Sequence, residues 1–159
     1  MNPTPEKTSV MAPFILMLFL YFIVGLFTVI NQQFQVPLKS ALLPHDGNMT
    51  NALVTLLNFS WFLAYPFSEG FATRWVDRLG YRKTSVYSLL IFIVGLGFYE
   101  AAVLLHIYAP SYITIMGNPI FTGFFVFLSG SFVIGMAVTI LQVVTGLYLD
   151  VNPVGKTNP

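Results

Sequence analysis

Residues 14–30 read FILMLFLYFIVGLFTVI, an apolar stretch interrupted only by Gly25 and Thr28. The surrounding residues 8–38 carry no charge. A helix that spans a bilayer needs roughly 20 apolar residues, so this segment is long enough to cross a membrane. It is too long for the core of a signal peptide, and no small-x-small cleavage site follows it. The stretch therefore predicts a first transmembrane helix at about residues 12–39.

The composition of the whole chain is that of a membrane protein in contact with a lipid bilayer. Of its 159 residues, 56% are hydrophobic and only 8% are charged, whereas about a quarter of a typical soluble domain is charged. The net charge of +1 excludes a basic face for nucleic acid. The lack of cysteine excludes a disulfide scaffold, a Cys-ligated metal site and thiol catalysis. Because no Ser-His-Asp set or other catalytic constellation is present either, we do not expect an enzyme.

Three more apolar segments follow the first, and turn-forming residues separate them. Two prolines and one glycine mark residues 108–119 as a loop. We expect an all-α membrane protein with four transmembrane helices, a short segment at residues 1–11 before them and a loop at residues 150–159 after them. The helices are expected at about residues 12–39, 50–74, 84–106 and 120–149.

The orientation follows from the positively charged residues. The connection between the second and third helices holds four basic residues and one acid: Arg74, Arg78, Arg82, Lys83 and Asp77. Cytoplasmic loops carry an excess of Lys and Arg, so this connection is expected in the cytoplasm. With four spans, both termini are then cytoplasmic as well. The expected location is multi-pass in the cytoplasmic (inner) membrane.

The same connection contains the run Asp77-Arg78-Leu79-Gly80-Tyr81-Arg82-Lys83. Gly80 permits a tight reversal with a positive φ. One interpretation is a generic basic turn that rests on an anionic leaflet. The run also resembles the helix 2–3 signature of the major facilitator superfamily, in which this loop latches the two halves of a transporter together. The resemblance implies a conformational latch formed by Asp77, Arg78, Gly80, Arg82 and Lys83.

Side-chain amides gather at the end of the first helix, at Asn31, Gln32, Gln33 and Gln35. Polar groups are costly in lipid, so they should face a partner or a wet cavity. An amide both donates and accepts hydrogen bonds and therefore suits hydroxyl groups. The alternative is a polar helix end at the outer membrane interface.

This segment resembles the end of helix 1 in the fucose–proton symporter and glucose/galactose permease branch of the superfamily, with matches at Asn31, Leu38, Lys39 and Ser40. Leu141-Gln142-Val143 resembles a run in helix 4 of the glucose/galactose permeases. Gln32 and Gln142 stand where the fucose symporter has carboxylates. The resemblance implies that Asn31, Gln32 and Gln142 bind sugar hydroxyls. At a rise of about 1.5 Å per residue, Gln32 and Gln142 differ in depth by roughly 8 Å, so one sugar could reach both.

Trp61 and Asn58, both in the second helix, complete the expected substrate-binding set. An indole ring can stack on a sugar, although Trp61 can equally be a packing or lipid-facing residue. Small residues, Gly95 with Gly97 and Ser131 with Gly135, are expected to permit close contacts between helices.

Two acids remain inside the helices. An amide cannot carry a proton, so Gln32 and Gln142 cannot couple transport to one. We expect Glu69 to reach Arg74 or the cytoplasmic interface. Glu100 is expected near the outer surface, where interfacial solvation, pairing with His106 and a coupling-ion role are all open. The coupling ion could be H⁺ or Na⁺. No other cofactor is expected, and no metal, because the two histidines are single and far apart.

Taken together, the patterns predict ion-coupled transport of a monosaccharide (a hexose or deoxyhexose) by alternating access. Members of the superfamily have twelve spans, so this chain would supply the first four, and the remaining helices are expected downstream of an interrupted loop at residues 150–159. The alternative is a complete four-helix membrane protein that works as an oligomer, either a small exporter or an assembly factor. Small exporters of that design depend on a glutamate in their first helix, and none is present here.

Overall fold

The computed structural model describes residues 11–33, 37, 40, 43, 48–115 and 117–151. In this part of the chain, three helices are long and apolar enough to cross a membrane. The predicted end of the first helix at Lys39 lies outside the described residues, as do residues 1–10 and 152–159. The elements in chain order are α1 (Met11–Gln33), α3 (Asn48–Tyr108), β1 (Tyr112–Ile115), β2 (Asn118–Phe121) and α4 (Thr122–Val151).

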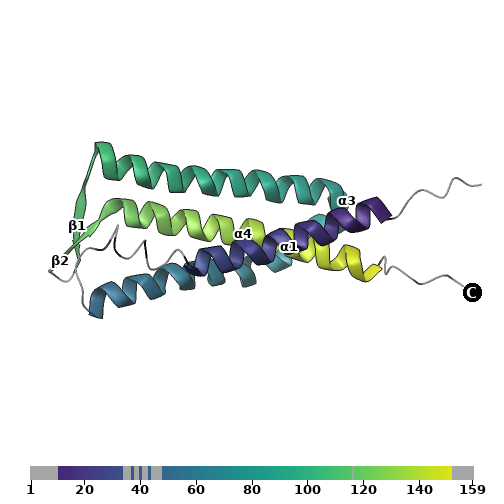
Figure 1. The fold of residues 1–159 in the computed structure, drawn as a ribbon, viewed down its shortest axis with the longest axis horizontal. Helices are drawn as coiled ribbons and strands as arrows, with labels where there is room; N and C mark the ends of the chain where they lie inside the picture. The colour runs from purple at the N-terminus through teal and green to yellow at the C-terminus, as the bar shows by residue number, and fades with distance from the viewer. Residues whose placement is uncertain are drawn as a thin grey trace, which may run out of the picture.

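Helix α3 is bent into two helical arms that meet at Gly80. A straight helix of its 61 residues would be about 92 Å long, some three times the thickness of the hydrocarbon core. At Gly80 the backbone has φ 78° and ψ 166°, which confirms the expected positive φ. We call residues 48–79 the first arm and residues 81–108 the second arm. Figure 1 shows the two arms running in opposite directions, with α4 drawn between them.

The predicted connection at residues 75–83 was too long. Residues on both sides of Gly80 are helical, and Gly80 alone leaves the helical region. Only glycine adopts this backbone conformation without steric cost, so one residue is enough to reverse the chain. The side chain of Thr84 then donates a hydrogen bond of 2.9 Å to the carbonyl oxygen of Gly80, which supports the first turn of the second arm.

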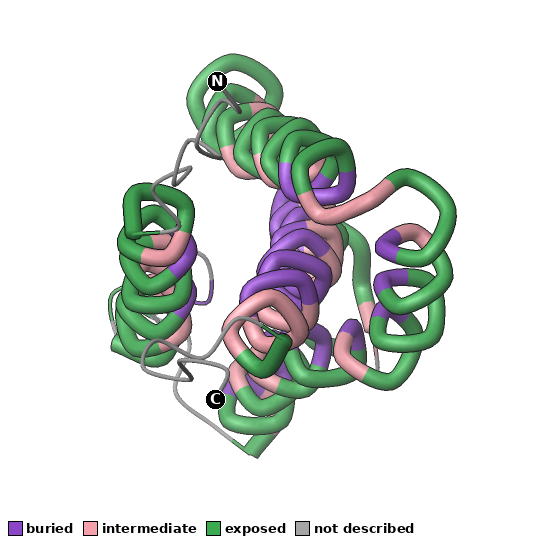
Figure 2. The backbone as a smooth tube through the Cα atoms, turned by 90° about the vertical axis from the view of Figure 1, so that its right-hand side faces the viewer, coloured by how far each residue is buried: buried purple, intermediate pink, exposed green. Residues whose placement is uncertain are grey.

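Helix α4 is the central helix of the bundle. In its most apolar 18-residue window, 61% of the residues are buried, and Figure 2 shows the buried residues gathered at the centre of the molecule. A Cβ atom at Gly135 would lie 2.6 Å from the carbonyl oxygen of Trp61 in the first arm. One at Gly130 would lie 2.8 Å from the ring of Tyr99 in the second arm. The absence of side chains at these two positions lets both arms approach α4 closely.

Helix α1 lies on the outside of the bundle. Only Met17 and Val24 are buried among its residues, and it packs on α4. Phe27 also reaches the second arm, where its ring centroid lies 4.8 Å from that of Phe92. The start of α1, the bend of α3 and the end of α4 lie at one end of the molecule in Figure 1.

A two-stranded antiparallel hairpin occupies the other end, where the sequence predicted only a loop. Ile113 of β1 pairs with Ile120 of β2, and Thr114 pairs with Pro119. Pro119 is accommodated because a two-stranded ribbon has outer edges that need no amide donor. Gly117 turns the chain with φ 81°. The fold is therefore mostly helical rather than all-α.

Candidate functional site

A cavity of about 510 Å³ lies between α1, both arms of α3 and α4. Its volume falls within the range of about 300–1,000 Å³ that is typical of small-molecule sites. Two neighbouring pockets of the described residues are much smaller, at about 60 Å³ each. Its lining consists of Phe27, Ile30, Asn31, Trp61, Phe92, Leu96, Tyr99, Glu100, Val103, Phe127 and Ile134.

The wall of the cavity is aromatic and aliphatic, with a few polar groups. Asn31 brings an amide from α1, Trp61 an indole from the first arm, and Glu100 a carboxylate from the second arm. Asn31 is half-buried, whereas Trp61 is only 2% exposed. An apolar pocket with a small number of convergent polar groups is the usual composition of a ligand site.

Contacts between the second arm and α4 fix one side of the cavity. The hydroxyl groups of Tyr99 and Ser131 share a hydrogen bond of 2.9 Å. The rings of Tyr99 and Phe127 are stacked, with centroids 4.0 Å apart and an interplanar angle of 3°. Gly130 makes room for the Tyr99 ring. Glu100 follows Tyr99 directly in the chain, so its backbone is held in place by this packing.

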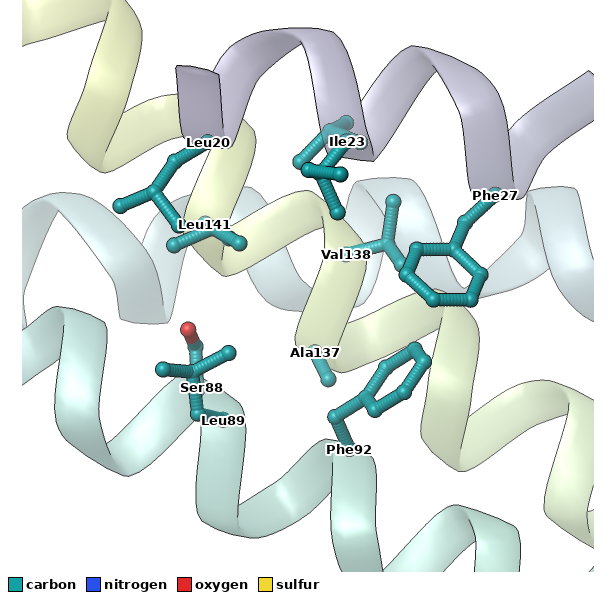
Figure 3. Close-up of a pocket in the computed structure, with 10 residues that line it drawn as sticks. Leu20, Ile23, Phe27, Ser88, Leu89, Phe92, Ala137, Val138 and Leu141 are labelled. Carbon is teal, nitrogen blue, oxygen red and sulfur yellow. The ribbon is translucent and has the colours of Figure 1, made fainter. Parts of the chain in front are cut away.

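An aromatic pair closes the cavity toward the bent end of α3. Phe27 and Phe92 line both the large cavity and a smaller pocket of about 60 Å³. Figure 3 shows the two rings next to each other at one end of that smaller pocket, with Leu20 and Leu141 toward its other end. The smaller pocket is almost entirely apolar, and Ser88 supplies the hydroxyl that Figure 3 shows at its edge.

Two polar atoms near the cavity are buried without a partner. They are Oδ1 of Asn58 and Nε1 of Trp61, and no other buried side-chain nitrogen or oxygen in the described part of the chain lacks a hydrogen bond. An unsatisfied buried donor or acceptor costs about 1–3 kcal/mol. Asn58 precedes Trp61 by three residues on the first arm, so the two side chains lie on one helix face. Both atoms are enclosed by protein, with less than 1 Å² of accessible surface each.

The structure brings only part of the predicted substrate-binding set together. Asn31 and Trp61 line the cavity, whereas Asn58, one helical turn from Trp61, is not among the lining residues. Gln32 is exposed and is not among the lining residues. Gln142 lies outside the lining too, and its Oε1 accepts a hydrogen bond of 3.4 Å from the hydroxyl of Tyr65. Gln32 and Gln142 therefore do not share one site in this conformation.

The charged residues predicted to form a latch surround the bend of α3. Asp77, Arg78, Arg82 and Lys83 are all exposed. Aromatic contacts hold the bend itself. Trp75 packs against Tyr87 with ring centroids 6.1 Å apart, and Tyr81 packs against Tyr148 of α4 with centroids 5.5 Å apart. The charged side chains at the bend are therefore exposed, while aromatic packing holds the backbone that carries them.

Tyr99 and Glu100 are cavity residues that the sequence did not single out as substrate-binding. Glu100, which was expected near the outer surface, is exposed, and it also contributes to the lining of the cavity together with Asn31. Its neighbours in the lining are Phe92, Leu96 and Val103. This spacing of three or four residues traces a single helix face, and the periodicity alone could have grouped them.

No group of three or more His, Cys, Asp or Glu residues gathers to hold a metal ion within the described ranges. Comparison of the chain with protein-family models, with curated proteins and with solved structures finds no match.

Proposed function

We propose that this protein takes part in the transport of a monosaccharide across the cytoplasmic membrane by alternating access. The observation that carries the proposal is the cavity of about 510 Å³ between α1, α3 and α4. It combines the two features that a sugar requires: polar groups that bond hydroxyls, and aromatic faces that pack against the apolar face of a pyranose ring.

The chemistry of the lining fits a hexose or deoxyhexose. The Asn31 amide donates and accepts hydrogen bonds, so it can bond a hydroxyl in either sense. The Glu100 carboxylate accepts from hydroxyl donors, and such charge-assisted hydrogen bonds are the stronger ones. Trp61 and Tyr99 contribute amphipathic rings to the same lining. We assign substrate contact to Asn31, Trp61 and Glu100, with Asn58 as their neighbour.

In this proposal each arm of α3 crosses the membrane once, so the chain contributes four spans. The excess of basic residues around Gly80 then lies in the cytoplasm. The ends of α1 and α4 at that end of the bundle lie there too. Asp77, Arg78, Arg82 and Lys83 are exposed and are available to latch against another part of a transporter of the major facilitator type.

The proposal is tested by uptake measurements. Cells that express the gene are given radiolabelled D-glucose, D-galactose or L-fucose under an imposed proton or sodium gradient. Accumulation of at least one sugar that depends on a gradient is the expected result, and the effective gradient identifies the coupling ion. Failure to take up any monosaccharide, with the protein present in the membrane, would contradict the proposal.

A second candidate is a membrane protein that works as an oligomer of this four-helix unit. The observation in its favour is the extent of uncovered apolar surface on α1, where Phe22 is 63% exposed and Ile15 is 57% exposed. Either lipid or another protein surface covers these side chains. Cross-linking between cysteines introduced at Ile15 and Phe22 in native membranes separates the two: efficient dimers favour the oligomer, and monomers favour lipid.

A further inference from the structure

We infer that the cavity between α1, α3 and α4 prefers an amino sugar to a neutral sugar, because a protonated amine pairs with the Glu100 carboxylate. This inference rests on the proposed function and names the substrate class of the same site. It starts from the charge of the cavity wall. Among the described residues that line the cavity, Glu100 alone is charged. It is exposed, so its carboxylate is open to a ligand.

The described part of the chain offers the Glu100 carboxylate no basic partner. His106 lies six residues farther along the second arm, about 120° around the helix from Glu100, and its ring packs edge-on against Phe121 with centroids 5.0 Å apart. The arginines and the lysine of the described ranges lie near the bend of α3, about 20 Å or more from Glu100 along the helix axes. Covering a charge without a partner is costly. A ligand that covers Glu100 is therefore favoured when it brings a positive charge.

The position of Glu100 along the cavity sets where that positive charge lies. The rings of Phe27 in α1 and Phe92 in the second arm pack together, with centroids 4.8 Å apart, and both helices run away from the bent end of the molecule (Figure 1). Asn31 follows Phe27 by four residues and Glu100 follows Phe92 by eight, so they lie about 6 Å and about 12 Å beyond the aromatic pair. All four residues line the cavity. A ligand that rests on the aromatic pair therefore meets the amide first and the carboxylate beyond it.

This order of groups fits a hexose that carries an amino group in place of one hydroxyl. The apolar face of a pyranose ring packs on the aromatic pair, and its hydroxyls donate to or accept from the Asn31 amide. The protonated amine donates to the Glu100 carboxylate, and such a charge-assisted hydrogen bond is stronger than one between neutral groups. A sugar acid is repelled by the same carboxylate. The cavity should therefore bind an amino sugar best, a neutral sugar less well and a sugar acid least.

The experiment compares sugars that differ in charge but share one ring. The full chain in phosphatidylcholine nanodiscs is titrated by calorimetry at pH 6 with D-glucosamine, D-glucose or D-glucuronate, and empty nanodiscs supply the blank. At this pH a primary amine is protonated and a carboxylate is ionised. D-glucosamine should bind about three- to tenfold more tightly than D-glucose, the gain expected for an exposed charge-assisted hydrogen bond. D-glucuronate should bind more weakly than D-glucose. D-galactosamine and D-galactose repeat the comparison on a second hexose.

A matched pair of variants assigns the preference to Glu100. Glu100→Gln removes the charge and keeps the size of the side chain, so the ratio of the affinities for D-glucosamine and D-glucose should fall to about one. Glu69 is an exposed acid on the first arm that does not line the cavity. Glu69→Gln should leave the ratio unchanged. The ratio stays informative even if a substitution weakens both sugars, because a general change in the fold affects them equally.

The outcomes separate this inference from the proposed function. If no sugar binds saturably to the unaltered chain, amino sugars included, the proposed function is overturned and this inference with it. Equal affinities for D-glucosamine and D-glucose, or tighter binding of D-glucuronate, overturn this inference alone. A preference for the amine that survives Glu100→Gln, or that Glu69→Gln abolishes as well, also overturns it.

Discussion

Helices α1 and α4 are both apolar enough to span a membrane, but they occupy opposite environments. In the most apolar window of α4, 61% of the residues are buried, against 11% in α1. Buried positions of α4 run along most of its length and include Gly130, Ser131, Gly135 and Ala137. Those of α1 are Met17 and Val24 alone.

Small residues, rather than hydrophobicity, distinguish the buried helix of this bundle from the exposed one. Lipid tails are as apolar as a leucine side chain, so apolar residues alone do not draw membrane helices together. Close backbone approach does so, because it multiplies van der Waals contacts and brings hydroxyls within bonding distance. A Cβ atom at Gly135 would press on the backbone of Trp61, whereas one at Gly25 of α1 would meet nothing within 4 Å outside its own helix backbone.

The largest effect on stability is expected when a large side chain replaces Gly135. A leucine there must displace the backbone of the first arm, so Gly135→Leu should lower the free energy of unfolding by about 3 kcal/mol. Gly25→Leu in α1 should change it by less than about 0.5 kcal/mol, because the new side chain faces open space. Titration with a denaturing detergent, followed by circular dichroism, measures both. Equal effects of the two substitutions would contradict the central position of α4.

A second glycine pair distinguishes a requirement for space from a requirement for backbone conformation. Gly80→Ala should cost about 1–3 kcal/mol, because an alanine is strained at φ 78° and ψ 166°. Gly70 lies on the same helix, and a Cβ atom there would meet nothing within 4 Å. Gly70→Ala should therefore be neutral or raise the free energy of unfolding by up to about 1 kcal/mol. The same detergent titration is the measurement. A neutral Gly80→Ala would mean that the bend does not depend on the positive φ.

The smallest effect concerns hydroxyl groups. Ser131 of α4 bonds Tyr99 of the second arm, so Ser131→Ala should cost about 0.6–1 kcal/mol. Thr28 of α1 donates only to the carbonyl oxygen of Val24 in its own helix. Thr28→Ala should therefore stay within about 0.5 kcal/mol of the unaltered chain. Equal losses of unfolding free energy for the two substitutions would contradict a stabilising role for the hydrogen bond between Ser131 and Tyr99.

The sequence predicted the helical segments well because apolar runs of this length have few alternatives. It also predicted the positive φ of Gly80 and the close contacts at Gly95, Ser131 and Gly135. The same prediction was wrong for Gly97, which is exposed and where a Cβ atom would meet nothing within 4 Å. The hairpin was missed because Pro119 and Gly117 were interpreted as loop residues. A hairpin is nevertheless indicated by the β-branched residues of Ile113–Ile115 and by the two-residue connection before Asn118.

The cavity was harder to predict than the helices. Asn31 and Trp61 could be named from residue type alone, but the contribution of Glu100 depends on how the second arm is rotated against α1 and α4. That rotation is set by Gly130, Tyr99 and Ser131, whose contacts join residues about 30 positions apart. Gln32 and Gln142 were predicted to share a site because they lie at similar depths along their helices. Depth does not determine the face of the helix on which a side chain lies.

The central claim, that the cavity binds a monosaccharide, is tested most directly by equilibrium binding to two variants of adjacent residues. Asn31 lines the cavity, and Gln32 is exposed beside it. With radiolabelled sugar and the full chain in nanodiscs, Asn31→Leu should weaken binding by about tenfold. Gln32→Leu should leave it within about twofold. The opposite order, or equal losses, would contradict the assignment of this cavity as the sugar site.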